Sequence, residues 1–301
     1  MKIRRIELSE IVEFLGNKVI NVIGNKCGVY IDNLADVERV NETTLDWINP
    51  SKANKQEIAE NSKAHVLLVD ETITPICGKV LIVVKKPKVV LAEIGNHYFV
   101  DKPISGIHPT AIIDPEAMIG SNCHVGPYCV IGKAKIGANC VIESNVRIYD
   151  EVELGEGCSV KPGAVLGGEG FGFEKDGNGN RFRFPQIGSL VIGKYVEIGS
   201  NTCIDRGALS ETVIGDYTKI NNLCHIAHNN KIGRNVSITA CVNLSGGNVI
   251  EDNVWVAPNS SLRGYVHIGE GAFIGTGAVV VKDIPAHETW VGNPAHKLEK
   301  K

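Results

Sequence analysis

The sequence predicts a mainly β protein in which a parallel β-helix of hexapeptide repeats follows a small α/β domain. From Ile107 onward an aliphatic residue recurs every six positions with few breaks, and over 214–280 twelve such residues follow one another without a slip. The chain holds 33 glycines but only 7 Phe, 7 Tyr and 3 Trp, a balance that favours tight, repeated turns. A six-residue period is typical of a β-helix whose coils each contain three short strands and about 18 residues.

Composition limits the functional class. The 301 residues are 43% hydrophobic with a formal net charge of −3, which is ordinary for a globular protein and gives no support for a broad nucleic-acid-binding surface. The longest apolar runs, such as "KVLIVVKK", are far shorter than the ~20 residues of a membrane span. Glu7, Glu10 and Glu13 interrupt any signal-peptide core, so we interpret the protein as cytoplasmic.

Residues 1–103 lack the period and predict a small α/β domain. One helix is expected to begin at an N-cap at Ser9 and to end at Gly16, and a second helix is expected over 87–98. The runs "HVLLVD" and "KVLIVV" are expected to form buried strands. "TLDWINPSK" offers an exposed-looking Trp47 in a turn beside Asn49. The β-helix is expected over 104–283, with a short C-terminal extension over 284–301.

Small or β-branched residues mostly fill the position two before each aliphatic residue. Five of the nine cysteines occupy this slot: Cys123, Cys129, Cys140, Cys158 and Cys224. Buried cysteine behaves as a small hydrophobe, so these side chains are predicted to be structural. The chain has no CxxC pair and no secretory signal, so neither a disulfide framework nor a zinc site of the usual spacing is expected.

The stretch "NNLCHIAHNNKIG" carries the candidate catalytic residue. Residues 18 apart stack in adjacent coils at about 4.8 Å, which places His228 next to Gly246 and then Gly264. Glycines leave open space and exposed N–H groups above a turn histidine, and histidine titrates close to neutral pH. His225 precedes an inward Ile226 and is expected to point outward.

Two insertions interrupt the period. The first, 167–191, is glycine-rich with four phenylalanines, and we expect an ordered loop folded over the coil or onto a neighbouring subunit. The second, 205–212, adds four residues to one turn. Since position 210 lies one regular coil before His228, both insertions are expected close to that histidine. Interruptions are where function usually enters a repeat protein.

Three motifs in order, "FGFEKDGNGNRFRFPQIG", "IDRGALSETVIG" and "IAHNNKIG", resemble the UDP-3-O-acylglucosamine N-acyltransferases of lipid A synthesis. The resemblance covers nearly the whole chain. It implies a left-handed β-helix, a homotrimer, uridine binding by the N-terminal domain, and a 3-hydroxyacyl donor on acyl carrier protein, with no further cofactor and no metal. The family's catalytic base falls on His228, and its oxyanion contact falls on the backbone N–H of Gly246.

Further residues are candidates for contacts with the substrates. Asn222 or Asn229 would orient the imidazole or hold sugar hydroxyls, and Asp205 and Arg206 would bind the sugar or its diphosphate, since the arginine fork matches phosphate oxygens. The nucleotide is expected at Trp47 and Asn49. The acyl donor is expected at Phe171, Phe173, Gly264, Trp290 and Asn293.

The sequence also departs from the family pattern. Asp46 and Lys52 stand where the family has its uracil-stacking aromatics, and Asn221–Asn222 stands where it usually has Asp-Asn. Tyr265 replaces a second histidine, with His267 two residues away. The ending "VGNPA" resembles the terminal strand of CoA-dependent hexapeptide sugar N-acetyltransferases, rather than the family's helical extension.

Two alternatives follow. One keeps the fold and the base but uses acetyl-CoA on another nucleotide-activated amino sugar. The other is a non-catalytic or metal-dependent β-helix protein, similar to γ-carbonic anhydrases, which would need three converging histidines. His225 and His228 would supply two of them, but three residues apart on a turning coil they are expected to diverge.

Overall fold

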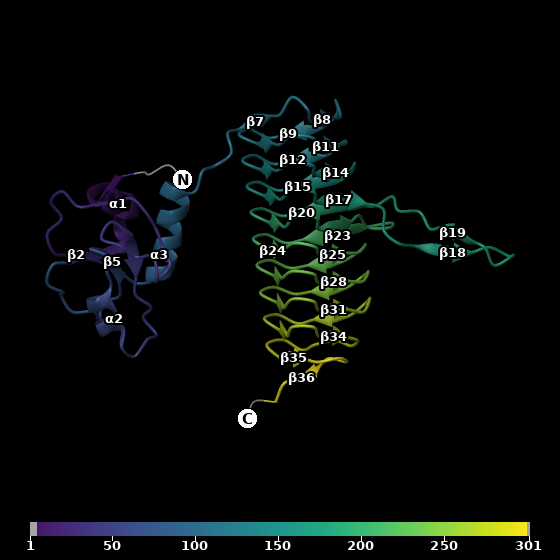
Figure 1. The fold of residues 1–301 in the computed structure, drawn as a ribbon. Helices are drawn as coiled ribbons and strands as arrows, with labels where there is room; N and C mark the ends of the chain where they lie inside the picture. Colours follow the sequence, from purple (N-terminus) through teal and green to yellow (C-terminus); the bar gives the residue numbers. More distant parts are fainter. Residues whose placement is uncertain (1–4, 300–301) are drawn as a thin grey trace. The chain divides into compact units, whose positions relative to one another are not determined.

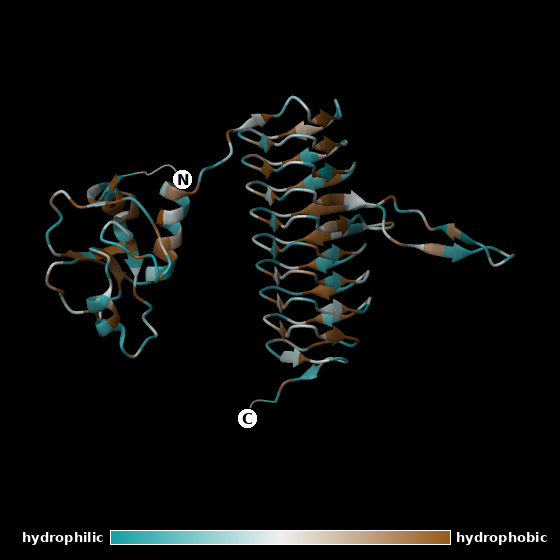
Figure 2. Cartoon of the chain, viewed as in Figure 1, coloured by the Kyte–Doolittle hydropathy of each residue, from teal (hydrophilic) through white to brown (hydrophobic). Residues whose placement is uncertain are grey.

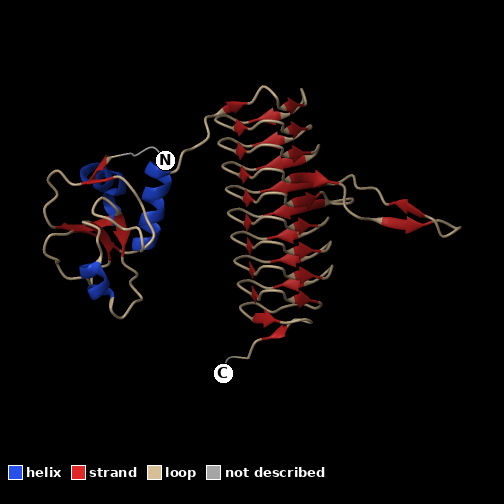
Figure 3. Ribbon diagram, in the orientation of Figure 1, coloured by secondary structure: helices blue, strands red, loops and turns tan. Residues whose placement is uncertain are grey.

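The computed structural model describes residues 5–299, which divide into two compact units between Lys102 and Pro103. The N-terminal unit holds a four-stranded sheet in the order β2-β6-β5-β4. The strands are β2 (Val19–Ile23), β4 (Leu45–Trp47), β5 (Val66–Val69) and β6 (Val80–Val84), with a short pair of β1 (Ile6–Glu7) and β3 (Tyr30–Ile31). The helices are α1 (Leu8–Leu15), η1 (Gly16–Lys18), α2 (Lys55–Asn61), α3 (Pro87–Ile94) and η2 (Gly95–Phe99) (Figures 1 and 3).

This sheet is covered on both faces. Alternate side chains of β5 and β6 pack with α1 and α3 on one face, and the others pack with α2 on the second face. Both predicted strands are confirmed. The predicted N-cap is wrong: Glu7 takes that place instead of Ser9, and its N–H donates to Glu10 Oε1 at 3.4 Å, while Gly16 does close the helix.

The position predicted for Trp47 is also wrong. Trp47 ends strand β4 instead of standing in a turn, and its indole is partly buried against the α1–α3 side of the sheet. Leu45 and Trp47 point to the same face because side chains alternate along a strand.

The second unit is a stack of coils with three parallel sheets (Figure 1). Sheet I contains β7 (Gly106–Ile107), β10 (His124–Val125), β13 (Val141–Ile142), β16 (Ser159–Val160), β21 (Glu197–Ile198), β24 (Lys219–Ile220), β27 (Ser237–Ile238), β30 (Trp255–Val256), β33 (Phe273–Ile274), β35 (Thr289–Val291) and the antiparallel β36 (His296–Lys297). Sheet II contains β8 (Ile112–Ile113), β11 (Val130–Ile131), β14 (Arg147–Ile148), β17 (Val165–Gly168), β22 (Cys203–Asp205), β25 (His225–Ile226), β28 (Asn243–Leu244), β31 (Ser261–Leu262) and β34 (Val279–Val280). Sheet III contains β9 (Met118–Ile119), β12 (Lys135–Ile136), β15 (Val152–Leu154), β20 (Ser189–Ile192), β23 (Glu211–Ile214), β26 (Lys231–Ile232), β29 (Val249–Ile250) and β32 (His267–Ile268).

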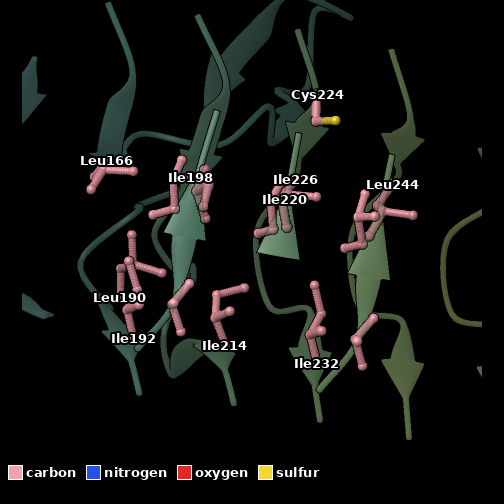
Figure 4. Packing of buried hydrophobic residues seen from close by; sticks show 14 of the residues in the cluster. Leu166, Leu190, Ile192, Ile198, Ile214, Ile220, Cys224, Ile226, Ile232 and Leu244 are labelled. Atoms are coloured by element: carbon pink, nitrogen blue, oxygen red, sulfur yellow. The ribbon is translucent and has the colours of Figure 1, made fainter. Parts of the chain in front are cut away.

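The six-residue period places one aliphatic side chain per strand in a continuous core. Ile226 lies between Ile204 and Leu244 of the adjacent coils. Side chains of all three sheets, such as Ile198, Ile226 and Ile214, point into the same interior (Figure 4). Hydrophobic residues recur along the strands of every coil (Figure 2). The predicted mainly β fold of hexapeptide coils is therefore confirmed.

The five slot cysteines lie in this core, as predicted. Their Sγ atoms face carbonyl oxygens of the coils, as Cys129 faces Glu143 at 2.9 Å and Cys224 faces Thr239 at 3.0 Å. Burial raises the pKa of the Cys129 and Cys224 thiols. A buried thiol kept protonated is unreactive.

Both insertions leave the coil in turns that connect sheet II to sheet III, and both lengthen the spacing between paired residues of adjacent coils. Cys203, before the second insertion, pairs with His225, whereas Val213, after it, pairs with Lys231 at the regular spacing of one coil. The second insertion therefore lies between sheets II and III, in the turn that precedes β23. The first insertion carries a hairpin, β18 (Phe173–Lys175) and β19 (Arg181–Arg183), that projects away from the coil (Figure 1). Of the two predicted placements, folding over its own coil is wrong for this hairpin, and contact with a neighbouring subunit stays a prediction.

None of the helices within residues 5–299 has the length and apolar character that a bilayer crossing requires.

Candidate active site

His228 occupies the turn after β25 and lies between two glycines. A methyl group placed on Gly170, in the first insertion, would lie 2.8 Å from His228 Cδ2. A methyl group on Gly246, in the next coil, would lie 2.8 Å from Cε1 and 3.0 Å from Nε2. Carbon atoms in contact normally stay about 3.5–4.0 Å apart. The partly buried imidazole fits this slot only because neither neighbour carries a side chain.

Asn229 fixes the tautomer of this imidazole. The Asn229 Oδ1 atom accepts a hydrogen bond from the backbone N–H of Ala208 at 3.1 Å and lies 2.9 Å from His228 Nδ1. A backbone N–H can only donate, so the side-chain atom between them must be the amide oxygen. The proton therefore sits on Nδ1, and Nε2 keeps a free lone pair, which is the form that a general base needs.

Both insertions contact the turn that carries His228. Asn229 Nδ2 donates to Ser210 Oγ at 2.8 Å, and the Asn229 backbone N–H donates to Thr212 Oγ1 at 2.8 Å. The return leg of the first insertion bonds to the second, with Ile187 N–H donating to the Ala208 carbonyl at 2.7 Å. The predicted convergence of the two insertions on His228 is thus observed.

Asp205 places a carboxylate near both histidines of this turn. Its side chain is only 13% exposed, and Oδ2 lies 3.9 Å from His225 Nε2. Burial raises the pKa of Asp205 to about 6, against an opposing effect of His225 and His228. His225 points outward, as predicted, with its side chain about half exposed. Asp205 is therefore an electrostatic neighbour of His228 as well as a candidate sugar ligand.

The Gly246 backbone N–H is free beside the histidine. It donates to no group among residues 5–299, while the next N–H, of Gly247, donates to the His228 carbonyl at 3.0 Å and fixes the two coils together. Gly264 follows Gly246 in the next coil, as the stacking predicts, and Tyr265 beside it is 81% exposed. The turn after β28 therefore presents an unpaired backbone N–H in Gly246, the residue that lies next to His228 Nε2.

Arg206 makes contacts other than those predicted. Its Nε donates to the Gly167 carbonyl at 2.8 Å, and a terminal nitrogen donates to the Asp150 carbonyl. The guanidinium thereby ties the start of the second insertion to the base of the first. These bonds direct the fork at backbone carbonyls, so Arg206 is not a free anion ligand here.

Asn222 does not orient the imidazole within the chain. It lies in the turn before β25, between sheets I and II, whereas His228 lies in the turn after β25. Asn222 Oδ1 accepts the Ser200 backbone N–H at 2.7 Å. Asn229 alone takes the orienting role that the sequence left open between the two.

Trp290, predicted at the acyl donor, is instead a core residue. Only 7% of it is exposed, it pairs with Ile274 in the inward register, and its Nε1 donates to Glu288 Oε2 at 2.8 Å. The indole closes the end of the hydrophobic core. Asn293 lies in a segment whose neighbours Gly292 and Ala295 bond to β34, three coils from His228 along sheet II, or about 14 Å at ~4.8 Å per coil.

Phe171 and Phe173 lie on the outgoing leg of the first insertion. Phe171 is 84% exposed, and its ring meets Phe173 edge-on with centroids 5.0 Å apart. Arg183 from the return strand lies 4.9 Å over the Phe173 ring. These side chains form an exposed apolar cluster close in sequence to Gly170.

Trp47 lies beside a pocket in the N-terminal unit. The pocket measures about 410 Å³, and Asp46 and Asn61 also line it. Asn49 Oδ1 accepts the Ser51 backbone N–H at 3.0 Å and so is engaged in its own turn.

The structure adds Gln186, a residue that the sequence did not single out. It is 6% exposed, and its Oε1 is the one buried side-chain polar atom without a hydrogen-bond partner within 5–299. A methyl group on Gly170 would touch both this oxygen and the His228 ring. The "PQIG" of the first motif contains Gln186, but no repeat or spacing distinguishes it.

The stacked hexapeptide coils with a histidine held at one corner define a transferase of the hexapeptide class. The bacterial transferase hexapeptide family, six repeats, matches residues 133–168 and 249–282. A UDP-3-O-acylglucosamine N-acyltransferase from Pseudomonas syringae pv. tomato is 36% identical over 308 aligned residues, covering 92% of this chain and 82% of that protein. The corresponding enzyme 1 of Francisella tularensis subsp. holarctica is 37% identical over 96% of this chain and 90% of its own.

A solved structure gives the same assignment at the level of the fold and class. The UDP-N-acetylglucosamine O-acyltransferase of Moraxella catarrhalis is 28% identical, with a TM-score of 0.56 over 64% of this chain and 73% of that one. The protein is therefore an acyltransferase. It belongs to the UDP-3-O-acylglucosamine N-acyltransferase family.

Proposed function

We propose that this enzyme transfers a 3-hydroxyacyl group from acyl carrier protein to the amine of UDP-3-O-acylglucosamine, with His228 as the general base. The observation that carries the proposal is the slot itself: the imidazole is held between Gly170 and Gly246, with its tautomer fixed by Asn229. The names of the two bacterial relatives supply the substrate class.

The amine must lose a proton to attack the thioester carbonyl. His228 Nε2 carries the free lone pair and takes that proton, a role worth roughly 10²–10⁴-fold in rate. The nearby Asp205 carboxylate stabilises the imidazolium that forms. His228 then gives the proton to the leaving thiolate, so the base returns to its starting state without a covalent acyl-enzyme.

The tetrahedral intermediate places a negative charge on the former carbonyl oxygen. The unpaired Gly246 N–H is the donor that stabilises this charge. Loss of one such donor elsewhere costs about 10²–10³-fold in kcat. His228 and the Gly246 N–H lie on adjacent coils, in turns that connect sheets II and III, so the β-helix holds both rigidly.

The other candidate residues are assigned to two further binding regions, one in each compact unit. Along the β-helix, Gly264 and Asn293 would line the path of the thioester arm of the acyl donor, and Phe171 and Phe173 would contact the acyl chain of that donor. In the N-terminal unit, the pocket lined by Trp47, Asp46 and Asn61 would hold the uridine, although Asp46 and Lys52 occupy the positions of the family's stacking aromatics.

We also propose that the enzyme works as a homotrimer in the cytoplasm. The stacked Trp255 and Phe273 on sheet I, 44% and 41% exposed, form an apolar surface suited to a subunit contact. Light scattering on the purified protein should give three times the 32.4 kDa chain mass, and cell fractionation should recover it with cytoplasmic markers. A monomer in solution would contradict the trimer.

The decisive experiment is an acyl-transfer assay. Purified protein is incubated with UDP-3-O-acylglucosamine and 3-hydroxyacyl carrier protein, and separately with acetyl-CoA and a panel of nucleotide amino sugars, and products are identified by mass spectrometry. Turnover only with acetyl-CoA would overturn the proposed donor. His267→Ala is the matched control for His228→Ala, because His267 pairs with Glu251 at 2.9 Å on sheet III, away from the slot.

A further inference from the structure

Gln186 belongs to the wall of the His228 slot. A methyl group on Gly170 would lie 2.9 Å from Gln186 Oε1 and 2.8 Å from His228 Cδ2, so a single carbon atom there would touch both side chains. The amide is oriented: its Nε2 donates to the Phe184 carbonyl at 3.3 Å and lies on the Gly172 side, whereas Oε1 lies on the Gly170 side, toward the histidine.

The carbonyl of Gln186 is unusual in having no donor. A buried acceptor without a partner normally destabilises a fold, and such groups in native proteins call for an explanation. Because Oε1 is sealed from solvent, a substrate cannot reach it directly. His228, whose ring borders the same Gly170 position as this oxygen, is the residue whose charge changes during the reaction proposed above.

We propose that Gln186 is a positioning residue for His228: its unpartnered carbonyl, on the Gly170 side of the slot, favours the imidazolium that forms when His228 takes the amine proton. The negative end of an amide dipole, fixed in a buried setting, stabilises a positive charge without having to reorganise. Together with Asn229 at Nδ1 and the Asp205 carboxylate, it gives the imidazolium a third stabilising neighbour. The proposal rests on the proposed function of His228 as the base.

The charged surroundings of His228 limit which effects can be assigned to Gln186. Asp205 and His225 approach from β22 and β25, the Glu169–Arg183 ion pair at 3.4 Å flanks Gly170, and Tyr265 follows in the coils beyond Gly246. None of these is altered by a substitution of Gln186, so each variant is compared with wild type in the same electrostatic background.

The test is an NMR titration of His228 in the full-length protein, with ¹³C-labelled histidine and the signal assigned from its loss in His228→Gln. Gln186→Met removes the dipole at similar volume, and Gln186→Glu replaces it with a carboxylate. The pH at the midpoint of the His228 titration should fall by about half a pH unit in Gln186→Met and rise by about one pH unit in Gln186→Glu. The acidic limb of the kcat/KM profile should move in the same two directions, with kcat/KM of Gln186→Met down about threefold at neutral pH.

Controls separate this role from simple packing. Gln56→Met changes the chain's other glutamine, in α2, and should leave midpoint and activity unchanged. Thermal melting reports any loss of stability, but a packing defect cannot move the midpoint in opposite directions for Met and Glu. Midpoints that stay fixed, or that move in one direction in both variants, overturn the inference. Because the titration needs no substrate, absence of acyl transfer by wild type would overturn the proposed function separately.

Discussion

The narrow slot around His228 predicts a large effect from one methyl group. In Gly246→Ala the new Cβ would meet three ring atoms of His228 at 2.8–3.1 Å, against normal contacts of about 3.5–4.0 Å. The ring would have to retreat by roughly 0.7–1 Å. Gly170 lies on the Cδ2 side of the ring and limits its retreat, so the ring must turn and lose its bond to Asn229. A misplacement of about 1 Å at a reacting group costs around 10²-fold in rate.

We therefore expect Gly246→Ala to lower kcat/KM for acyl transfer about 100-fold, with little change in melting temperature. Gly246 has no left-handed backbone, and alanine keeps the N–H, so the substitution tests ring placement and not the oxyanion donor. Gly177→Ala is the matched control, because a methyl group there meets nothing within 4 Å. Wild-type kcat/KM in Gly246→Ala would refute the geometry argued for the base.

Three further substitutions test other parts of the molecule. His228→Gln should lower kcat by roughly 10²–10⁴-fold at an unchanged melting temperature, and a fully active variant would exclude it as the base. For Asp205 the folded pKa, about 6, lies above the ordinary value of 3.8, so its contribution to stability is present at low pH and is lost as pH rises through 6. In urea unfolding Asp205→Asn should therefore be more stable than wild type at pH 8, by up to about 3 kcal/mol, but equal to it below pH 4. Trp290→Ala should lose about 3 kcal/mol of unfolding free energy with an unchanged KM for the acyl donor, and a raised KM at full stability would restore its predicted role at the donor.

The sequence predicted the coil interior well because each hexapeptide repeats the same local geometry. Counting in steps of 18 places Ile226 next to Leu244 and His228 next to Gly246, and the structure has both. The same period identified the buried cysteines. No long-range information is needed, since each strand pairs only with its neighbours one coil away.

The count fails where the chain leaves the period. Across the second insertion the register between β22 and β25, which pairs Cys203 with His225, is longer than one regular coil, as the break in the period predicted, but the period does not predict the contacts that the extra residues make. The direction of the β18–β19 hairpin is likewise free of the period. Arg206 and Trp290 were assigned by residue chemistry and motif, yet their partners, two backbone carbonyls and the end of the core, follow from packing alone.

Breaks in the repeat explain why one turn histidine becomes a reactive group. The regular coil supplies Gly246 above the ring, but an unbroken coil would leave the opposite face of the imidazole in solvent. The first insertion brings Gly170 onto that side, with Gln186 next to Gly170, and the second brings Ala208 and Ser210 onto Asn229. Each insertion thus fixes a different edge of the same side chain. Shortening the hairpin beyond Phe173 should therefore be tolerated by the fold, whereas removing the legs that carry Gly170 and Gln186 should release the ring and abolish its defined orientation.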